Sequence, residues 1–362
     1  MLLIVKIGTS SVTTADGLID EQSIIKVCRE VASIYRQRHK VVIVTSGAVT
    51  AGIAVMGLKE RPGDVTTLQA LSAIGQHKLM SVYGEALEKE NLHAGQVLLT
   101  PLDFSVRSQY LHAKKTLERL LSLGVVPIVN ENDAIADDEL RFGDNDRLAA
   151  LVANLLAADL LLILTDTDGL FDADPRHADT ATLIEEVHAL DHSFDSVATG
   201  PSTQVGSGGM ASKLAAARMA AFSGIASVIA SAKRPNVIAD VVDGKKTGTK
   251  IAAHHDRLTA RRLWIAFGIR PKGILIVDDG AKKALLEKDA SLLAVGVVSV
   301  KGDFEEGEAV ELAGFDGKVF AKGLARQSSQ NSDTWIRKHS GDLPEDLSPI
   351  IVHRDDLVIF AG

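Results

Sequence analysis

Residues 141–168 have the sequence RFGDNDRLAALVANLLAADLLLILTDTD. The pattern predicts a turn, a helix and a buried strand in immediate succession. The helix is indicated by apolar residues at spacings of three and four, namely Leu148, Leu151, Val152 and Leu155. The unbroken apolar run at 160–164 then predicts a strand that is buried on both faces. A helix that leads directly into such a strand is typical of proteins with a parallel sheet.

Polar residues stand at both ends of this helix–strand pair. Thr165 and Asp166 follow the strand, at the edge where open α/β sheets bind ligands. Asn145 and Asp146 lie before the helix, so its free N–H groups face the same region. An aspartate at this position can also be an ordinary helix cap. A binding site is therefore indicated only in combination with similar features elsewhere.

The same pattern recurs in the first half of the chain. Predicted strands at 2–7, 41–44 and 125–129 run into GTSS, TSGA and NEND, and Lys6 lies near the end of the first. Small, glycine-containing turns let backbone N–H groups approach an anion closely. Continuous apolar strands that alternate with helices predict an α/β fold, a three-layer αβα sandwich around a mainly parallel central sheet.

A further glycine-rich loop covers residues 206–210 and opens an alanine-rich helix that extends to Phe222. Lys213 lies in the first turn of this helix, an arrangement suited to holding polyphosphate. The spacing fits neither a P-loop nor a dinucleotide-binding fingerprint. A nucleotide-dependent dehydrogenase is thus disfavoured.

The pattern changes after Arg270-Pro271-Lys272-Gly273, which reads as a domain boundary. Short alternating strands with glycine turns are predicted there, at 274–277, 295–301, 309–312, 319–323 and 357–360. We therefore expect a catalytic domain at 1–260, a linker at 261–270 and a small, mostly β domain at 271–362. Residues 353–355, His-Arg-Asp, are interpreted as a turn before the last strand, without a catalytic role.

Composition excludes several classes of protein. The chain has 362 residues, is 46% hydrophobic, and carries a net charge of −8, which argues against general nucleic-acid binding. No apolar run approaches the ~20 residues that span a bilayer, and the N-terminus reads as a strand rather than a signal peptide. The single cysteine, Cys28, is expected to be a buried hydrophobe, which fits a reducing cytoplasm. The histidines show no metal-ligand spacing.

Taken together, these motifs resemble the glutamate 5-kinases, a family of the amino acid kinase fold whose members carry a C-terminal PUA domain. The resemblance covers nearly the whole chain. It is carried by VKIGTS (5–10), IVTSGAV (43–49), NENDA (130–134), GDND (143–146), LLLILTDTDGLFDADPR (160–176), GSGGMASKL (206–214), VDDGAKKAL (277–285) and HRDD (353–356).

This resemblance implies ATP- and Mg²⁺-dependent phosphorylation of the side-chain carboxylate of L-glutamate to L-glutamyl 5-phosphate, the first step of proline biosynthesis. It implies a catalytic role for Lys6, Lys213 and Asp146. Mg²⁺ is expected to be held mainly by phosphate oxygens, and no metal-ligating residue is predicted. It places glutamate at Ser46, Asp133 and Asn145. It places ATP at Lys6, Gly8, Thr165, Asp166, Ser207, Gly208, Gly209, Met210, Ala211, Ser212 and Lys213.

The residues themselves fit such chemistry. A carboxylate nucleophile is already ionised near pH 7, because model carboxyl pKa values are about 4, and it needs no general base. The main obstacle is repulsion between two anions, which lysines and N–H donors reduce. Asp133 and Asn145 suit the α-amino end of glutamate, because a carboxylate pairs with an ammonium group and an amide can serve either end.

The resemblance also implies a homo-oligomer, dimeric or tetrameric, feedback inhibition by proline, and coupling to a glutamyl phosphate reductase. Two alternatives stay open: an aspartate or acetylglutamate kinase of the same fold, and an RNA-binding regulator that acts through the PUA-like tail. Residues 270–362 contain 12 Lys and Arg against 16 Asp and Glu, a net charge of −4, which disfavours RNA. Residues 347–352 also depart from the Gly-Tyr pair that often precedes HRD in the family.

Overall fold

The computed structural model describes residues 1–14, 16–135, 145–173, 175, 178, 180–188, 209–254, 258, 260–269, 271–288, 290–336, 338 and 348–359. The chain divides into two compact units, Met1–Arg257 and Leu258–Gly362. Each unit has a hydrophobic core of its own. Across the described residues, no helix is both long and apolar enough to cross a bilayer.

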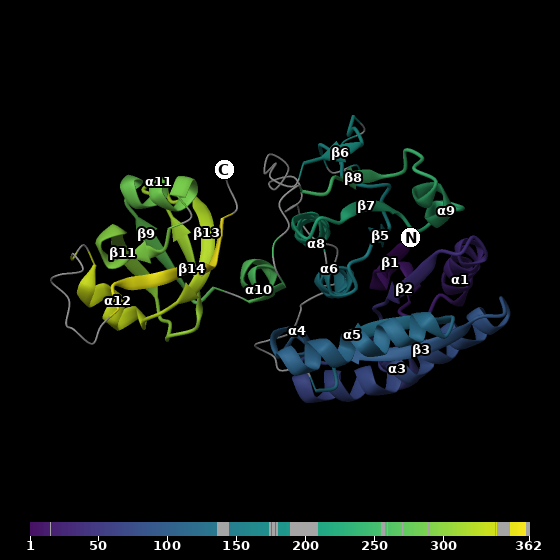
Figure 1. Ribbon diagram of the computed structural model, residues 1–362. Helices are drawn as coiled ribbons and strands as arrows, with labels where there is room; N and C mark the ends of the chain where they lie inside the picture. The colour runs from purple at the N-terminus through teal and green to yellow at the C-terminus, as the bar shows by residue number, and fades with distance from the viewer. Residues whose placement is uncertain are drawn as a thin grey trace. The chain divides into compact units, whose positions relative to one another are not determined.

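A mainly parallel sheet forms the centre of the first unit (Figure 1). Its strands, among the described residues, are β1 (Leu2–Ile7), β2 (Lys40–Val44), β3 (His93–Leu99), β4 (Val125–Glu131), β5 (Leu160–Thr165), β6 (Glu186–Val187), β7 (Ala226–Ser231) and β8 (Thr249–Ile251). They lie in the order β3-β4-β2-β1-β5-β7-β8-β6. The β7–β8 pair is antiparallel, and the other pairs run parallel.

Helices cover both faces of this sheet, so the unit is a three-layer αβα sandwich. One face is covered by α1 (Glu21–Arg36), α3 (Val65–Glu88) and α9 (Val237–Val242). The opposite face is covered by α5 (Arg107–Ser122), α6 (Asn145–Leu155) and α8 (Met210–Phe222). The shorter elements are η1 (Thr9–Ser11), α2 (Ala48–Val55) and α4 (Leu102–Ser105).

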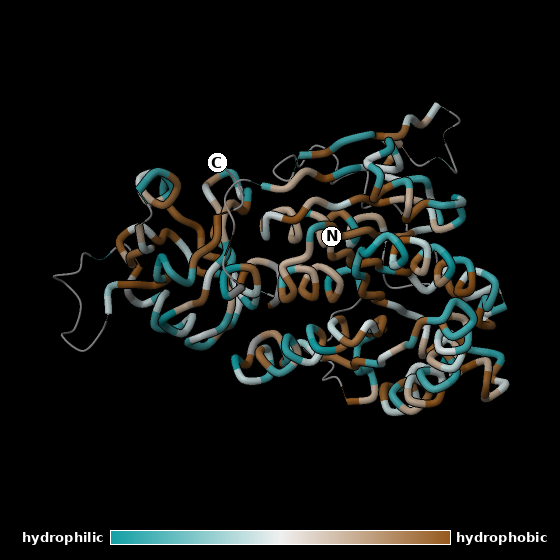
Figure 2. Tube along the Cα trace, turned by 45° about the vertical axis from the view of Figure 1, so that its right-hand side comes forward, coloured by the Kyte–Doolittle hydropathy of each residue, from teal (hydrophilic) through white to brown (hydrophobic). Residues whose placement is uncertain are grey.

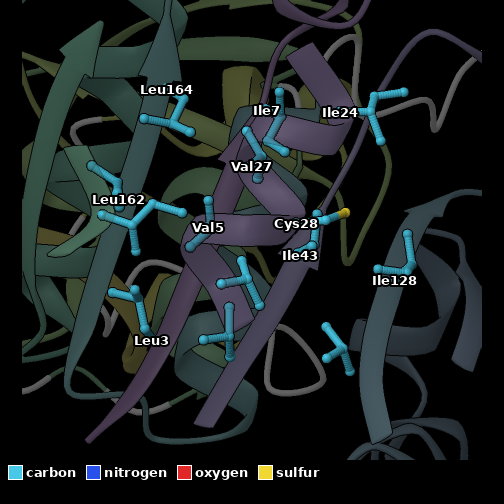
Figure 3. Close-up of a cluster of buried hydrophobic side chains, with 14 of the residues drawn as sticks. Leu3, Val5, Ile7, Ile24, Val27, Cys28, Ile43, Ile128, Leu162 and Leu164 are labelled. Carbon is cyan, nitrogen blue, oxygen red and sulfur yellow. The ribbon is translucent and has the colours of Figure 1, made fainter. Parts of the chain in front are cut away.

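The core between α1 and the sheet is built from aliphatic side chains and one thiol. Figure 3 shows Ile24, Val27 and Cys28 of α1 together with Val5 and Ile43 from β1 and β2. Cys28 is fully buried there, as the sequence predicts. Figure 2 shows the same arrangement along the trace, with hydrophobic strands inside and helices that alternate between hydrophobic and hydrophilic residues. Such alternation gives a helix one apolar face that can pack against the sheet.

The parallel arrangement determines where the polar residues gather. Lys6 of β1 pairs in register with Val44 on one side and Ile163 on the other. The carboxyl ends of β1, β2 and β5 therefore lie side by side. The residues that follow them in the chain emerge at one edge of the sheet, where ligands bind in folds of this class.

The second unit is mostly β. Its described strands are β9 (Gly273–Val277), β10 (Leu292–Leu293), β11 (Val297–Gly302), β12 (Ala309–Ala313), β13 (Val319–Ala325) and β14 (Ile350–Ile359), in the order β10-β14-β13-β12-β9-β11. Its helical segments are α10 (Ala260–Leu263), η2 (Trp264–Gly268), α11 (Asp279–Lys288), η3 (Ala294–Gly296) and α12 (Ser329–Trp335). The predicted fold class, an αβα sandwich with a separate β unit, is confirmed.

One local expectation for this unit is wrong. Residues 353–355, predicted to be a turn, lie inside the ten-residue strand β14. Charged residues persist there because the buried Asp356 carboxylate is paired with Arg261 and Arg326, at 2.7 and 2.9 Å. Within the expected linker, Ile265 is fully buried in a small apolar cluster of the second unit. The domain limits given above remain proposals.

Candidate active site

Three side chains from two distant parts of the chain meet at one buried carboxylate, that of Asp146 in the first turn of α6. The Lys6 ammonium, from the end of β1, forms an ion pair with Asp146 Oδ1. The Lys213 ammonium, from the first turn of α8, lies 3.3 Å from Asp146 Oδ2. The Ser212 hydroxyl lies 2.9 Å from the same oxygen. Two lysines separated by more than 200 positions thus share one aspartate.

The ionisation of Asp146 depends on these neighbours. Burial by itself would raise the pKa of this carboxyl, because a charge loses its hydration in the protein interior. The positive charges of Lys6 and Lys213 and the hydrogen bonds from Lys6 and Ser212 outweigh burial, and the pKa lies below its ordinary value. Two ammonium groups and one carboxylate leave the cluster with a net charge of +1, which favours an anionic ligand.

The glycine-containing turns bring the backbone close to this cluster. A Cβ atom on Gly8, directly after β1, would lie 3.6 Å from Lys6 Nζ. Gly209 precedes α8, and its carbonyl oxygen lies 2.8 Å from the Ser212 hydroxyl. Met210 and Ala211 complete the first turn of α8 with Ser212 and Lys213. Ser207 and Gly208, which were also assigned to the ATP site, lie outside the described residues.

A second group of polar side chains begins one residue before Asp146. The amide nitrogen of Asn145 lies 2.8 Å from Thr45 O, 3.0 Å from Ser46 Oγ and 2.8 Å from Asn130 Oδ1. The amide nitrogen of Asn130, in β4, in turn donates to Gln76 Oε1 of α3 at 2.7 Å. All five residues are buried. The structure therefore brings Ser46 and Asn145 together, and adds two amides that link them to α3.

Asp133 lies on the same side of the sheet edge. It follows β4 by two residues, and its Oδ2 accepts a hydrogen bond of 3.1 Å from the Ser72 hydroxyl of α3. Ser72 and Gln76 are four residues apart on α3, so they occupy the same face of that helix. One helical face therefore contacts both Asp133 and Asn130.

Asp166, directly after β5, borders a hollow of about 440 Å³. Thr165 is buried, and its hydroxyl donates to Asp166 Oδ1 at 3.1 Å. The residues that line the hollow come from the segments after β5 and β7; they are Asp166, Thr167, Asp168, Phe171, Pro175, Ser231, Lys233 and Arg234. An aromatic ring, carboxylates and two cations suit the base, ribose and phosphates of a nucleotide.

The segment after β7 is held by two residues of α1. Lys26 Nζ donates to the carbonyl oxygens of Ala232 and Arg234, at 2.7 and 2.8 Å. The buried Glu30 carboxylate accepts from the backbone N–H groups of Asn236 and Ile238, at 2.9 and 3.0 Å. The two side chains also pair with each other at 3.0 Å. We call this pair, Lys26 and Glu30, the α1 clamp.

Metal ligands of the usual kind do not gather in the described ranges. No group of three or more His, Cys, Asp or Glu side chains there could hold an ion. The carboxylate nearest the two lysines, Asp146, is occupied by their ammonium groups.

Sequence reasoning missed two members of the site. In the sequence, Asn130 is one of four polar residues that follow a predicted strand, and nothing in the local pattern distinguishes it from Asn132. Gln76 lies in the middle of a 24-residue helix, where a glutamine is ordinary. The one local hint is the neighbouring Gly75, which is unfavourable in a helix interior and so points to close packing.

Comparison with known proteins shows the family to which the chain belongs. The model of the amino acid kinase family matches residues 1–231, and that of the PUA domain matches residues 273–344. The chain is 43% identical over 362 residues to the glutamate 5-kinase of Nitrosomonas eutropha, covering 99% of this chain and 97% of that one. It is 40% identical over 361 residues to the glutamate 5-kinase of Serratia marcescens, covering 99% and 98%.

A solved isopentenyl phosphate kinase shares the fold of the first unit, with a TM-score of 0.50 at 19% identity. The match covers 70% of this chain and 100% of that one. One family assignment follows from these comparisons. It rests on the similarity over nearly the full length at about 40% identity and on the two matching family models, and the lysine–aspartate cluster is consistent with it. The chain belongs to the amino acid kinase family and, within it, to the glutamate 5-kinase group that carries a PUA domain.

Proposed function

We propose that this protein transfers the γ-phosphoryl group of ATP to the side-chain carboxylate of L-glutamate, which gives L-glutamyl 5-phosphate and ADP. The observation that carries the proposal is the position of Asn145 next to Asp146 at the start of α6. Through these two neighbours, a buried pair of lysines adjoins a buried cluster of amides and hydroxyls. The names of the relatives support glutamate as the acceptor.

The reaction needs no general base. An oxygen of the ionised γ-carboxylate attacks the γ-phosphorus, the bond from that phosphorus to the β,γ-bridging oxygen breaks, and ADP leaves with the electron pair. Lys6 and Lys213 reduce the repulsion between acceptor and donor and stabilise the charge on the transferring group. Asp146 is a positioning residue, because its carboxylate holds the two ammonium groups close together despite their mutual repulsion.

The nucleotide occupies the hollow beside Asp166, with its phosphates directed to Gly8 and to the first turn of α8, which contains Lys213. Lys233 and Arg234 supply positive charge along the hollow. Mg²⁺ fits this site as an ion bound mostly by phosphate oxygens, because the described residues offer it no ready-made cluster of carboxylates. When bound, it would neutralise phosphate charge.

The acceptor is bound by Ser46, Asp133 and Asn145. A carboxylate such as Asp133 pairs with the α-ammonium group, and the amide and hydroxyl groups suit the oxygens of the substrate. Ser46 and Asn145 hydrogen-bond to each other, so a substrate that contacts one of them is also positioned by the other.

The test is consumption of ATP with trapping of the acyl phosphate by hydroxylamine. Glutamate, aspartate and N-acetylglutamate are offered separately, with Mg²⁺ present or chelated. We expect a hydroxamate with glutamate and Mg²⁺, and little product in the other reactions. Preferential use of aspartate or N-acetylglutamate would assign the chain to a different acceptor within the same family.

Three further proposals follow from membership of the group. They are assembly into a dimer or tetramer, inhibition by proline, and delivery of the unstable acyl phosphate to a reductase, all in the cytoplasm. Light scattering of the purified chain tests the first proposal. Progress curves with added proline test the second, and a coupled assay in which a glutamyl phosphate reductase suppresses hydroxamate formation tests the third.

A further inference from the structure

Three buried amide side chains form a continuous hydrogen-bonded chain across the first unit. Gln76 lies on α3, Asn130 at the end of β4 and Asn145 at the start of α6. Asn130 donates to Gln76 at 2.7 Å, and Asn145 donates to Asn130 at 2.8 Å. Each of the three is at least nine-tenths buried.

Backbone groups determine which way each amide faces. The nitrogen of Asn145 faces the carbonyl oxygen of Thr45 at 2.8 Å, and a carbonyl can only accept. The oxygen of Asn130 faces the N–H of Glu131 at 3.0 Å, and an N–H can only donate. With Asn130 oriented in this way, its own nitrogen must face Gln76, so Gln76 must present its oxygen to Asn130. No rotation by 180° of any one amide preserves all of these bonds.

This orientation leaves an open hydrogen-bonding group at each end of the chain. Among the described residues, the amide nitrogen of Gln76 and the amide oxygen of Asn145 are buried and have no hydrogen-bond partner. Buried amides are rarely left in this state. The end at Gln76 therefore offers N–H donors, which suit a carboxylate, and the end at Asn145 offers an acceptor.

Glycines allow Gln76 to reach this position. A Cβ on Gly75 would lie 1.9 Å from Ala48 O, and a Cβ on Gly52 would lie 1.9 Å from Leu71 O. The backbones of α2 and α3 are therefore in direct contact. This contact brings α3 against the turn that follows β2, with Gln76 near Asn130.

The position of Gln76 along the chain of amides indicates which part of the substrate it binds. Asn145 adjoins Asp146 and the two lysines, where the reacting γ-carboxylate must lie. Gln76 lies two hydrogen bonds further away, on the helical face where Ser72 holds Asp133. The group that reaches Gln76 is therefore at the far end of the substrate from the transferred phosphoryl group.

We propose that Gln76 is a specificity-determining residue whose amide N–H groups bind the α-carboxylate of the acceptor amino acid, with Asp133 on the adjacent α-ammonium group. This inference rests on the proposed function, because it assigns a residue to the acceptor of that reaction. Asn130 acts through Gln76 and Asn145 as a positioning residue.

Two substitutions separate binding from structural support. Gln76→Met removes both the donor and the bond to Asn130. Gln76→Glu keeps an oxygen that can accept from Asn130 but places a negative charge where the α-carboxylate would bind. We expect the KM for glutamate to rise about 10- to 100-fold in Gln76→Met, because a hydrogen bond to a charged group is lost. We expect a larger rise in Gln76→Glu, with the KM for ATP unchanged in both.

A control variant and an analogue complete the experiment. Tyr83→Phe, on the same helix, removes the buried 2.9 Å bond to Thr45 Oγ1 and should leave the KM for glutamate near the wild-type value. 4-Aminobutyrate, which lacks the α-carboxylate, is tested as a competitive inhibitor. It should bind wild type more weakly than glutamate does, and the difference should shrink in Gln76→Met.

The outcomes distinguish this inference from the proposed function. Recovery of normal glutamate binding in Gln76→Glu, with a defect only in Gln76→Met, would show that Gln76 merely supports Asn130 and would overturn the proposal. An unchanged preference for glutamate over 4-aminobutyrate in Gln76→Met would overturn it as well. Wild-type protein that forms no hydroxamate from glutamate would instead refute the proposed function.

Discussion

Two buried aspartates, one in each unit, are each held between two cations, but the cations differ in kind and exposure. The lysines at Asp146 have side chains that are 3% and 8% exposed. The arginines at Asp356, Arg261 and Arg326, are 64% and 49% exposed. Buried ammonium groups have lost most of their hydration, so an entering phosphoryl group meets cations with little water to displace. Exposed guanidinium groups keep their water and serve mainly to tie β14 to its neighbours.

Replacing each aspartate by asparagine should give the largest contrast. Asp146→Asn leaves two buried ammonium groups without a counter-charge and should reduce the free energy of unfolding by about 3–5 kcal/mol. Asp356→Asn should cost only about 1 kcal/mol, because its arginines are solvated. Both tryptophans, Trp264 and Trp335, lie in the second unit, so their fluorescence in urea reports that unit. Circular dichroism reports both units.

The two units thus serve as controls for each other. The fluorescence transition should shift in Asp356→Asn, and the remaining circular dichroism transition should shift in Asp146→Asn. Equal losses from the two substitutions would remove the distinction between a binding cluster and a structural tie.

Removal of either lysine should lower kcat by about 10²- to 10³-fold, because a preorganised donor to the transferring group is lost. The variants are Lys6→Ala and Lys213→Ala, assayed by hydroxamate formation. The matched control is Lys322→Ala in the second unit, where a buried lysine donates to the carbonyl oxygens of Ala266 and Ile269. That variant should melt at a lower temperature yet keep its kcat. Near-normal turnover after loss of Lys6 or Lys213 would remove that lysine from the mechanism.

Acid should lower the free energy of unfolding through protonation of Asp146. The pKa of Asp146 is lower in the folded protein than in the unfolded chain, where it is about 4. Its stabilising contribution is therefore complete above pH 4 and is lost as the pH falls through the folded value. The unfolding free energy of wild type should fall more steeply below pH 4 than that of Asp146→Asn. Parallel curves would contradict the assigned shift.

The smallest expected effect concerns Cys28, whose thiol should not react with a thiol reagent in the native protein. Burial, together with the negative charge of Glu90, raises the pKa of its thiol to about 12. Hardly any thiolate exists at pH 8, and the thiolate is the reactive form. A thiol reagent should label the native protein negligibly and the urea-unfolded protein fully, as mass spectrometry would show. Rapid labelling of the native protein would mean that the core beneath α1 opens readily.

Sequence predicts the strands of the first unit well because each is a continuous apolar run, buried on both faces. The carboxyl ends of those strands then indicate where Lys6, Ser46 and Thr165 must gather. Local patterns say much less about Gln76, since its role depends on two glycines that let α2 and α3 touch and on an amide from a different strand. Such contacts between distant segments leave no periodic signal.

In the second unit, a local sequence pattern predicts the wrong structure. The polar residues at 353–355, just before Asp356, look like a turn, because an isolated segment of this composition prefers solvent. The strand continues through them because Arg261 and Arg326, from elsewhere in the chain, neutralise Asp356. A partner distant in sequence thus overrides the local preference.

The α1 clamp has a consequence for nucleotide binding. Four backbone groups after β7 are already tied to Lys26 and Glu30, so the chain that carries Lys233 and Arg234 has little conformational entropy left to lose when a ligand enters. Affinity on that side of the hollow is set in part by a helix whose side chains do not line it. With the nucleotide in this hollow, as proposed above, substitutions in α1 would change the retention of ATP or the release of ADP without altering any atom that touches the nucleotide.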